Sequence, residues 1–569
     1  MTEEREFRVR PGRIRSRGAG RSRSFIGRAL AAAELAGGRH GSSQRRASVF
    51  GRGRAASLRA NHGLGRRSRS AVVKARVVRH RAGRAPLSAH LDYLRREGVT
   101  QDRGAGRMFD AKGDEADHGA FAARCEEDRH HFRFIVSPDD AGELADLKAF
   151  TRDLMEQAER DLGTRLDWIA VDHWNTGHPH IHVLVRGRAD DGQDLVISRD
   201  YIREGLRAQA GRLVTLELGP RTDREIARRL ELEAEAERWT GLDRALARDA
   251  AEHDGVVDLR PRFGRRPDSF DQFKVQRARK LERLALAEPI GQGRWRLSPG
   301  AEATLRELSR RNDIIARLHR AMSGQGVERD PGSMRLDTDP NTSPVLGQLI
   351  GRGLDDELKG TAYVVIDGVD GKVHHVRLRD LDAATDAPLG SIVESRPSAA
   401  GYLSVRSDLS LAKQVHAEGA TWLDRQLVSV NPSEIRSGFG AEVRDAQSRR
   451  VDHLIGSGLA RREGGRVVFA RDLLETLRRR ELEAIGGRLA AEAGIPYRPT
   501  AAGDQVAGVY RQRVALASGR FAMIDDGLGF TLVPWRPDLE RRLGSEVSGV
   551  ALPGGRIDWS FGRQKGLGR

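Results

Sequence analysis

Cysteine is almost absent from this chain: Cys125 is the only one among 569 residues. A single thiol excludes a disulfide within the chain and a thiolate metal cage. Long apolar runs are also lacking, since no stretch of about 18 apolar residues occurs, and this excludes a membrane-spanning helix. Residues 25–37 come nearest to a signal peptide, but Arg28 and Glu34 interrupt them. The sequence therefore predicts a soluble, cytoplasmic protein.

Positive charge is concentrated near the start of the chain. Lys and Arg total 98 against 81 Asp and Glu, a formal net charge of +17, and residues 1–70 hold 18 arginines with only 4 acidic residues. This Arg-, Gly- and Ser-rich composition predicts a disordered arm. Guanidinium groups bind phosphate oxygens in pairs, so the arm is expected to bind nucleic acid, with three candidate contacts: Arg66, Arg67 and Arg69. A solubilising tail is the alternative.

The first folded domain is predicted to cover residues 71–235. Runs of alternating or β-branched residues predict strands, and periodic segments between them predict helices. The predicted strands are 71–80, 131–136, 166–173, 180–186 and 195–197, and the predicted helices are 87–97, 138–162 and 199–218. This order favours an α+β fold, with an antiparallel sheet and helices on one face.

The rest of the chain is long enough for further units, at roughly 100–200 residues per domain. The composition predicts helical, winged-helix-like and small β-rich parts. The expected segments are a charged helical connector at 236–268, a winged-helix-like unit at 269–322, a linker at 323–345 and a C-terminal mixed α/β domain at 346–569.

A pattern of helix, Gly-rich hairpin and helix occurs twice in this region. The apolar positions correspond in order: Leu284, Trp295, Leu297 and Leu305 in the first occurrence, and Leu454, Val467, Phe469 and Leu477 in the second. We expect either two winged-helix-like units or two ordinary helical subdomains.

Histidine is unusually dense between residues 173 and 182. Side chains alternate along a strand, so His180 and His182 share one face of the predicted strand 180–186. A hairpin places His173, at the end of the preceding strand, beside them. Three neutral imidazoles that leave coordination positions open can bind a metal ion. Histidines that merely pack are the alternative.

These residues resemble the third motif of conjugative relaxases, the DNA-strand transferases that start plasmid mobilisation. The similarity lies in the spacing His173-x-Asn175-x-x-x-x-His180-x-His182. Residues 89–98, which contain Tyr93, resemble the first relaxase motif, and residues 134–138 resemble the segment between the two. Residues 166–175 are similar to the relaxase branch that carries a C-terminal domain of unknown function.

The resemblance implies a mechanism and a set of roles. Tyr93 would attack a phosphodiester of single-stranded DNA, leaving a 5′-phosphotyrosine, while His173, His180 and His182 hold a divalent metal, Mg²⁺ or Mn²⁺. Tyr201 is a competing nucleophile. Four further residues are candidates for orienting the ligands or contacting the substrate: Asp172, Asn175, His178 and Ser137.

The implied activity is site- and strand-specific DNA nicking and strand transfer at an origin of transfer. The implied partners are single-stranded or nicked DNA, accessory relaxosome proteins and a type IV secretion coupling protein. The expected location is cytoplasmic, with export alongside the DNA during conjugation as an alternative.

Three other functions fit parts of the pattern. A histidine-triad nucleotide hydrolase would use His180 or a neighbouring histidine as nucleophile and would need no metal. A rolling-circle replication initiator would use much the same triad and tyrosine. A non-catalytic DNA-binding protein would use only the basic arm and the winged-helix-like units.

Overall fold

The computed structural model describes most of the chain beyond residue 50. The described residues are 51–60, 67–80, 87–96, 99–102, 104–174, 179–261, 269–338, 344–380, 382–396, 402–430, 435–540 and 542–560. The chain divides into two units, residues 1–308 and 309–569, and each is described by itself. Both are mixtures of helices and largely antiparallel sheets, which confirms the α+β class.

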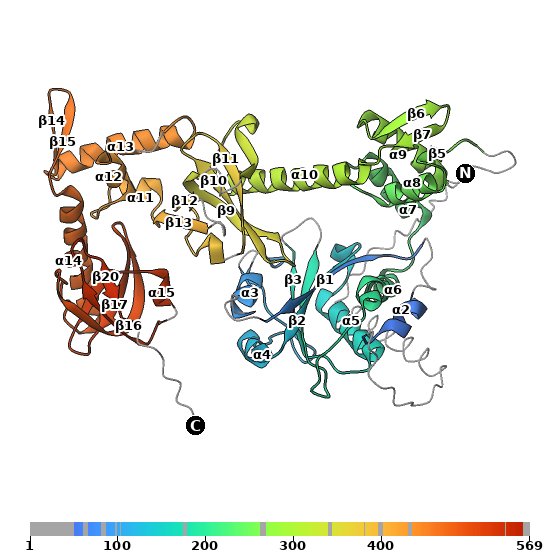
Figure 1. Cartoon of the computed structure of the whole chain (residues 1–569), viewed down its shortest axis with the longest axis horizontal. Helices are drawn as coiled ribbons and strands as arrows, with labels where there is room; N and C mark the ends of the chain where they lie inside the picture. Colours follow the sequence, from blue (N-terminus) through green and yellow to red (C-terminus); the bar gives the residue numbers. More distant parts are fainter. Residues whose placement is uncertain are drawn as a thin grey trace, which may run out of the picture. The chain divides into compact units, whose positions relative to one another are not determined.

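A four-stranded antiparallel sheet forms the centre of the first part of the chain (Figure 1). Its order is β1-β2-β4-β3, so β4 lies between β2 and β3. The strands are β1 (Ala71–Arg79), β2 (His130–Pro138), β3 (Trp168–His173) and β4 (His180–Arg186). Four of the five predicted strands are therefore present, and β3 and β4 pair as the predicted hairpin. The fifth, residues 195–197, is not a strand, and Ile197 forms only an isolated bridge with Arg52.

One face of this sheet packs against the two longer helices. Phe134, Ile181 and Val183 point into a core shared with helices α5 (Leu147–Leu162) and α6 (Leu206–Leu218). Helix α5 begins where the Asp146 side chain accepts hydrogen bonds from the backbone NH groups of two first-turn residues, and ends at Gly163, whose φ is 65°.

The opposite face also carries helices. Ile169, Val171 and Leu184 pack with α3 (Leu87–Leu94) and α4 (His118–Cys125). The prediction of helices on one face is therefore wrong. The sequence predicted α3, as residues 87–97, but not the eight-residue helix α4, and together the two helices cover the face on which the histidines lie.

The ordered structure begins before residue 71. Helix α2 spans Arg54–Ala60, and the backbone NH of Arg52 donates to the carbonyl of Val196 at 2.8 Å. Part of the predicted disordered arm is therefore folded. Residues 1–50 and 61–66 lie outside the described part of the chain.

A helical region with a small sheet follows the first domain. It consists of α7 (Asp223–Glu235), α8 (Gly241–Ala251), β5 (Val256–Asp258), α9 (Ser269–Arg283), β6 (Ala287–Gly291), β7 (Arg294–Leu297) and α10 (Ala301–Gly324). Leu246 and Val257, from the predicted connector, share a core with Trp295 and Leu305. The stretch 236–268 therefore belongs to the helix-and-hairpin unit.

The second unit contains two larger sheets with a helical segment between them. The first sheet has the order β13-β12-β9-β10-β11-β8, with β8 (Met334–Thr338), β9 (Leu346–Asp356), β10 (Thr361–Gly368), β11 (Val373–Leu378), β12 (Ile392–Arg396) and β13 (Tyr402–Ser407). Strand β8 lies in the predicted linker and pairs in parallel with β11.

The helical segment again contains a hairpin. Its elements are α11 (Leu411–Val415), α12 (Trp422–Leu427), α13 (Phe439–Gly456), β14 (Ala460–Glu463), β15 (Arg466–Phe469) and α14 (Leu473–Ala493). The last sheet has the order β18-β17-β16-β19-β20, with β16 (Gln505–Leu516), β17 (Gly519–Asp525), β18 (Phe530–Pro534), β19 (Glu546–Ala551) and β20 (Ile557–Trp559); α15 (Pro537–Glu540) precedes β19.

Across the described residues, every helix is too short or too polar to cross a bilayer.

Candidate metal centre

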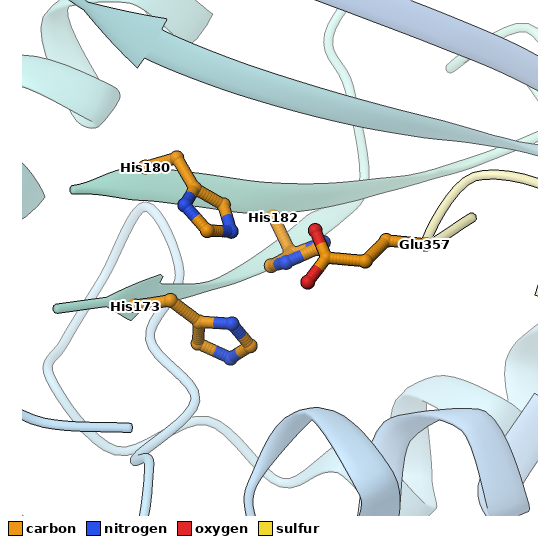
Figure 2. Close-up of side chains that lie close together, drawn as sticks. All are labelled: His173, His180, His182 and Glu357. Atoms are coloured by element: carbon orange, nitrogen blue, oxygen red, sulfur yellow. The ribbon is translucent and has the colours of Figure 1, made fainter. Parts of the chain in front are cut away.

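Three histidines come together at the open end of the β3–β4 hairpin. His173 is the last residue of β3 and pairs across the strands with His180, the first residue of β4. His182 pairs with Val171, so all three imidazoles project from one face, the face covered by α3 and α4. Figure 2 shows the three rings converging from the two strands.

The rings are close enough to share one ion. One nitrogen of each lies within 4.8 Å of one nitrogen of each of the others. The ring centroids of His173 and His182 are 4.5 Å apart, and those of His180 and His182 are 5.0 Å apart. All three side chains are buried, with at most 7% of their surface exposed. This donor set fits a divalent metal ion, and imidazole ligands by themselves do not select which one.

The proton on His173 has a determined position. Its Nε2 lies 2.8 Å from the backbone carbonyl of Leu94, and because a carbonyl can only accept, Nε2 carries the hydrogen. The lone pair is then on Nδ1, a buried atom with no hydrogen-bond partner in the described structure. Such a bond on the outer nitrogen is what orients a histidine ligand toward a metal.

Burial keeps His173 neutral. Removal from water, and then the charges of His182 and Arg96, lower the pKa of His173 to about 2. The imidazole therefore offers a lone pair rather than a positive charge throughout the neutral pH range.

The helix that carries Tyr93 ends at this centre. Leu94, whose carbonyl accepts from His173, is the next residue and the last of α3. The Tyr93 ring is half-buried against the core below α3 and α4, and the guanidinium carbon of Arg96 lies 4.2 Å from its centroid. Arg96 is also one of the charges that lower the pKa of His173. One cation thus lies near both the tyrosine and the triad.

Two of the other predicted site residues have different surroundings. Ser137 lies on the triad face beside the start of β4, and its hydroxyl donates to the Pro179 carbonyl at 3.3 Å. Asp172 projects from the other face of β3, where it accepts a 2.6 Å hydrogen bond from Nε1 of Trp174. Asp172 therefore does not orient a triad histidine. Asn175 and His178 lie outside the described residues.

Tyr201 is far less suited to react than Tyr93. Its side chain is 2% exposed within the core on the opposite face of the sheet, and its hydroxyl donates to Asp161 at 2.9 Å. Burial, followed by the charge of Asp161, raises the pKa of Tyr201 well above its usual value. The structure removes it as a competing nucleophile.

The three arginines predicted to contact DNA do not form one exposed group. Arg69 is 5% exposed, and its guanidinium binds Asp140 and Glu225. It is a structural ion pair inside the domain, which corrects its assignment to a disordered DNA-binding arm. Arg67 is exposed and pairs with Asp223 at 3.0 Å. Arg66 lies outside the described residues.

The sequence prediction missed a group of cations on the triad face. Lys74 of β1 pairs with Ile135 of β2, which in turn pairs with His182, so these residues form one row across the sheet. Arg76 and Arg133 lie in the next row. Neither β1 nor β2 contains an acidic residue. The available signal was the alternation of Lys74 and Arg76 within a strand whose only other polar residue is Arg79.

The chain was also compared with known proteins. Residues 274–402 and 399–568 match a family described as a protein of unknown function, DUF3363. No curated protein and no solved structure matches. Because the two matched segments together cover just over half of the 569 residues, the chain belongs to the DUF3363 family.

Proposed function

We propose that this protein is a relaxase-like enzyme, which nicks one DNA strand with Tyr93 and transfers that strand with the help of a divalent metal. The observation that carries the proposal is the triad: three buried imidazoles bring their nitrogens within 4.8 Å at the end of the tyrosine-bearing helix. A packing role explains poorly why Nδ1 of His173 is buried with no hydrogen-bond partner in the described structure.

His173, His180 and His182 would hold the metal. When bound, a divalent ion polarises a non-bridging phosphate oxygen and offsets negative charge in the transition state. The protein's contribution is to keep three neutral rings in fixed positions, and the hydrogen bond from His173 to Leu94 fixes one of them. Mg²⁺ and Mn²⁺ are both proposed, although Mg²⁺ usually prefers oxygen ligands.

The covalent step belongs to Tyr93. Its Oη forms a bond to the phosphorus while the bond from phosphorus to the 3′ oxygen breaks, and the phenolic proton leaves the enzyme as the 3′ oxygen takes up one. The products are a 5′-phosphotyrosine and a free 3′-hydroxyl. The reverse reaction rejoins a strand without ATP, because the phosphotyrosine retains the energy of the broken bond. Arg96, stacked on the Tyr93 ring, would stabilise the ionised phenol and the phosphate.

The face of the sheet that carries the three histidines also carries positively charged side chains, which suit a negatively charged nucleic-acid strand. Lys74, Arg76 and Arg133 lie on the same face of the sheet as the histidines, and we propose that they contact successive phosphates. We further propose that the natural substrate is an origin of transfer, where relaxosome proteins and a type IV secretion coupling protein would be the partners.

A capture assay tests the reaction without knowledge of the target sequence. The protein is incubated with Mn²⁺ and randomised single-stranded oligonucleotides, and covalent adducts are isolated on denaturing gels and sequenced. We expect an adduct with the parent protein and with Tyr402→Phe, a control at an exposed tyrosine in β13. Tyr93→Phe should give none, and a chelator should prevent the reaction.

The same assay separates the rival functions. An adduct that persists in Tyr93→Phe would remove the assigned nucleophile. Release of mononucleotides without metal would favour a histidine-triad hydrolase, and DNA binding without any adduct would favour a non-catalytic protein. A replication initiator would give the same adduct, so the captured sequence decides whether the site lies at an origin of transfer or of replication.

A further inference from the structure

The chain contains the same buried ion pair twice. Arg277 of α9 binds Asp243 at 2.7 and 2.9 Å, and Arg450 of α13 binds Asp424 at 2.8 and 2.9 Å. All four side chains are 0% exposed. Buried guanidinium–carboxylate pairs are uncommon, because both charges must leave water.

The remaining donors of the two arginines are used in the same way. Each guanidinium donates to the carbonyls of the residues nine, seven and five positions before its aspartate: Ala234, Ala236 and Arg238 for Arg277, and Val415, Ala417 and Gly419 for Arg450. Each aspartate also accepts from a threonine three residues earlier, in a capping box that begins a helix. The match extends to individual atoms.

The elements that follow are also equivalent. In each case a helix with the buried arginine leads into a hairpin and then a long helix. The backbone NH of Leu286 donates to Leu281, and that of Leu459 donates to Leu454. At the far end of the hairpin Ser298 donates to Leu286, and Ala470 donates to Leu459. Leu281 rather than the predicted Leu284 is therefore the counterpart of Leu454.

The sheets that follow the two long helices have one topology. The order β11-β10-β9-β12-β13 in the first corresponds to β18-β17-β16-β19-β20 in the second, with every neighbour antiparallel. Each sheet also has a parallel partner at the same edge. Strand β8 pairs in parallel with β11, and Tyr497 forms a parallel bridge with Phe530 of β18. We call residues 234–407 copy 1 and residues 415–560 copy 2.

The hairpins of the two copies differ in sequence but keep one charged position. Arg294 and Arg466 each begin the second strand of the hairpin, directly after a glycine of positive φ, Gly293 or Gly465. Arg466 is exposed and makes no ion pair with any other residue in the described part of the chain. Its cross-strand neighbour is Glu463, which forms an ion pair with Arg461 instead.

Each hairpin carries more positive than negative charge. The strands of the first contain Arg294 and Arg296 against one glutamate, and those of the second contain Arg461, Arg462 and Arg466 against one glutamate. Arg466 is exposed, whereas Arg294 is half-buried and pairs across the small sheet with Asp258 of β5. A guanidinium fork donates paired hydrogen bonds to the phosphate backbone of a nucleic acid, so these arginines suit that partner.

We propose that residues 234–560 are two copies of one nucleic-acid-binding unit, and that each copy contacts the phosphate backbone through its hairpin arginine, Arg294 or Arg466. This binding is separate from the proposed cleavage, since it needs neither Tyr93 nor the triad. Two such contacts on one chain would hold nucleic acid at two points and raise the overall affinity.

Fluorescence anisotropy with the full-length chain tests this proposal. The probe is a labelled 30-base-pair duplex, with a labelled 30-nucleotide single strand in a second arm, both in chelator so that no cleavage occurs. Arg466→Ala and Arg294→Ala should each weaken binding several-fold, and the double variant more. The slope of log affinity against log salt should become shallower by about 0.9 for each duplex phosphate that the protein no longer neutralises, and by about 0.7 for a single strand.

Two controls make the outcome decisive. Arg466→Lys keeps the charge and should retain most of the affinity, and Arg449→Ala removes an exposed arginine of α13 that pairs with Asp445 outside the hairpin. Unfolding curves show whether each variant is folded. The proposal is overturned if the folded double variant binds with the parent's affinity and salt slope, or if Arg449→Ala weakens binding equally.

Discussion

His173 donates its Nε2 hydrogen to the backbone carbonyl of Leu94, the residue that follows Tyr93. This bond joins the end of a strand to the end of a helix 79 positions earlier in the sequence. It fixes the ring so that Nδ1 carries the lone pair, and His173 can therefore act as a metal ligand together with His180 and His182.

Removal of any triad histidine should abolish tight metal binding. His173→Ala or His182→Ala takes one of three ligands away, and we expect the affinity for Mn²⁺ or Zn²⁺ to fall by at least about 100-fold. Isothermal titration calorimetry on metal-free protein measures the effect. His253→Ala, at an exposed histidine, is the control and should bind as the parent does. Equal binding by parent and triad variants would contradict a metal centre.

A buried histidine outside the triad, His375 of β11, should lower the free energy of unfolding at mildly acidic pH. It is fully buried, and neither ring nitrogen has a hydrogen-bond partner in the described structure. Burial, and then the charge of Arg317, lower its pKa to about 4, whereas unfolding restores its usual value of 6.5. Between these values the unfolded chain binds more protons, so the free energy of unfolding falls as the pH falls, by on the order of 3 kcal/mol from this group.

The equivalent position in copy 2 supplies the matched substitution. His375 faces Val365 across β10 and β11, as Leu532 faces Met523 across β17 and β18. His375→Leu should therefore raise the free energy of unfolding at pH 7 by about 1–3 kcal/mol, because two unsatisfied polar atoms disappear. It should also flatten the pH dependence from 6.5 to 4. Urea unfolding at several pH values tests both effects, and an unchanged slope would contradict the assignment.

Arg69→Ala should destabilise the first domain without weakening DNA binding specifically. The buried guanidinium binds Asp140 and Glu225, and its loss leaves both carboxylates without that partner. We expect a cost of about 1–3 kcal/mol, because the guanidinium is buried but both carboxylates are partly exposed and Asp140 keeps Arg221 as a partner. Arg67→Ala, at the exposed pair with Asp223, should cost less than about 1 kcal/mol. Thermal unfolding compares them, and equal losses would argue against the buried network.

Local patterns predicted the hairpin and the triad well. Alternation along residues 180–186 determined which side chains share a face, and a short connection required β3 to be its neighbour. Helix α3 was predicted, as residues 87–97, but α4 was missed and neither helix was placed on the second face of the sheet, because each is only eight residues long. Burial of Arg69 depends on partners 71 and 156 positions away, which no local pattern reveals.

The repeat was visible in the sequence only in part. Apolar positions around the hairpins predicted two similar helical units, but they gave no sign that the sheets after them correspond. Strand order depends on pairings between segments far apart in the chain, and the side chains have diverged, as His375 and Leu532 show. What the copies share most closely is a buried arginine with its carbonyl partners, an interaction that depends on backbone position.

The bond between His173 and Leu94 also couples the position of α3 to metal binding by the triad. A movement of α3 that breaks it frees the ring to rotate, and a ring held by an ion in turn resists that movement. Because such coupling is reciprocal, a ligand that stabilises this position of α3 must raise the affinity for the ion by the same factor by which the ion raises the affinity for that ligand. Under the proposed function, a DNA strand bound against α3 would therefore strengthen metal binding, and the protein without DNA would release the metal more readily.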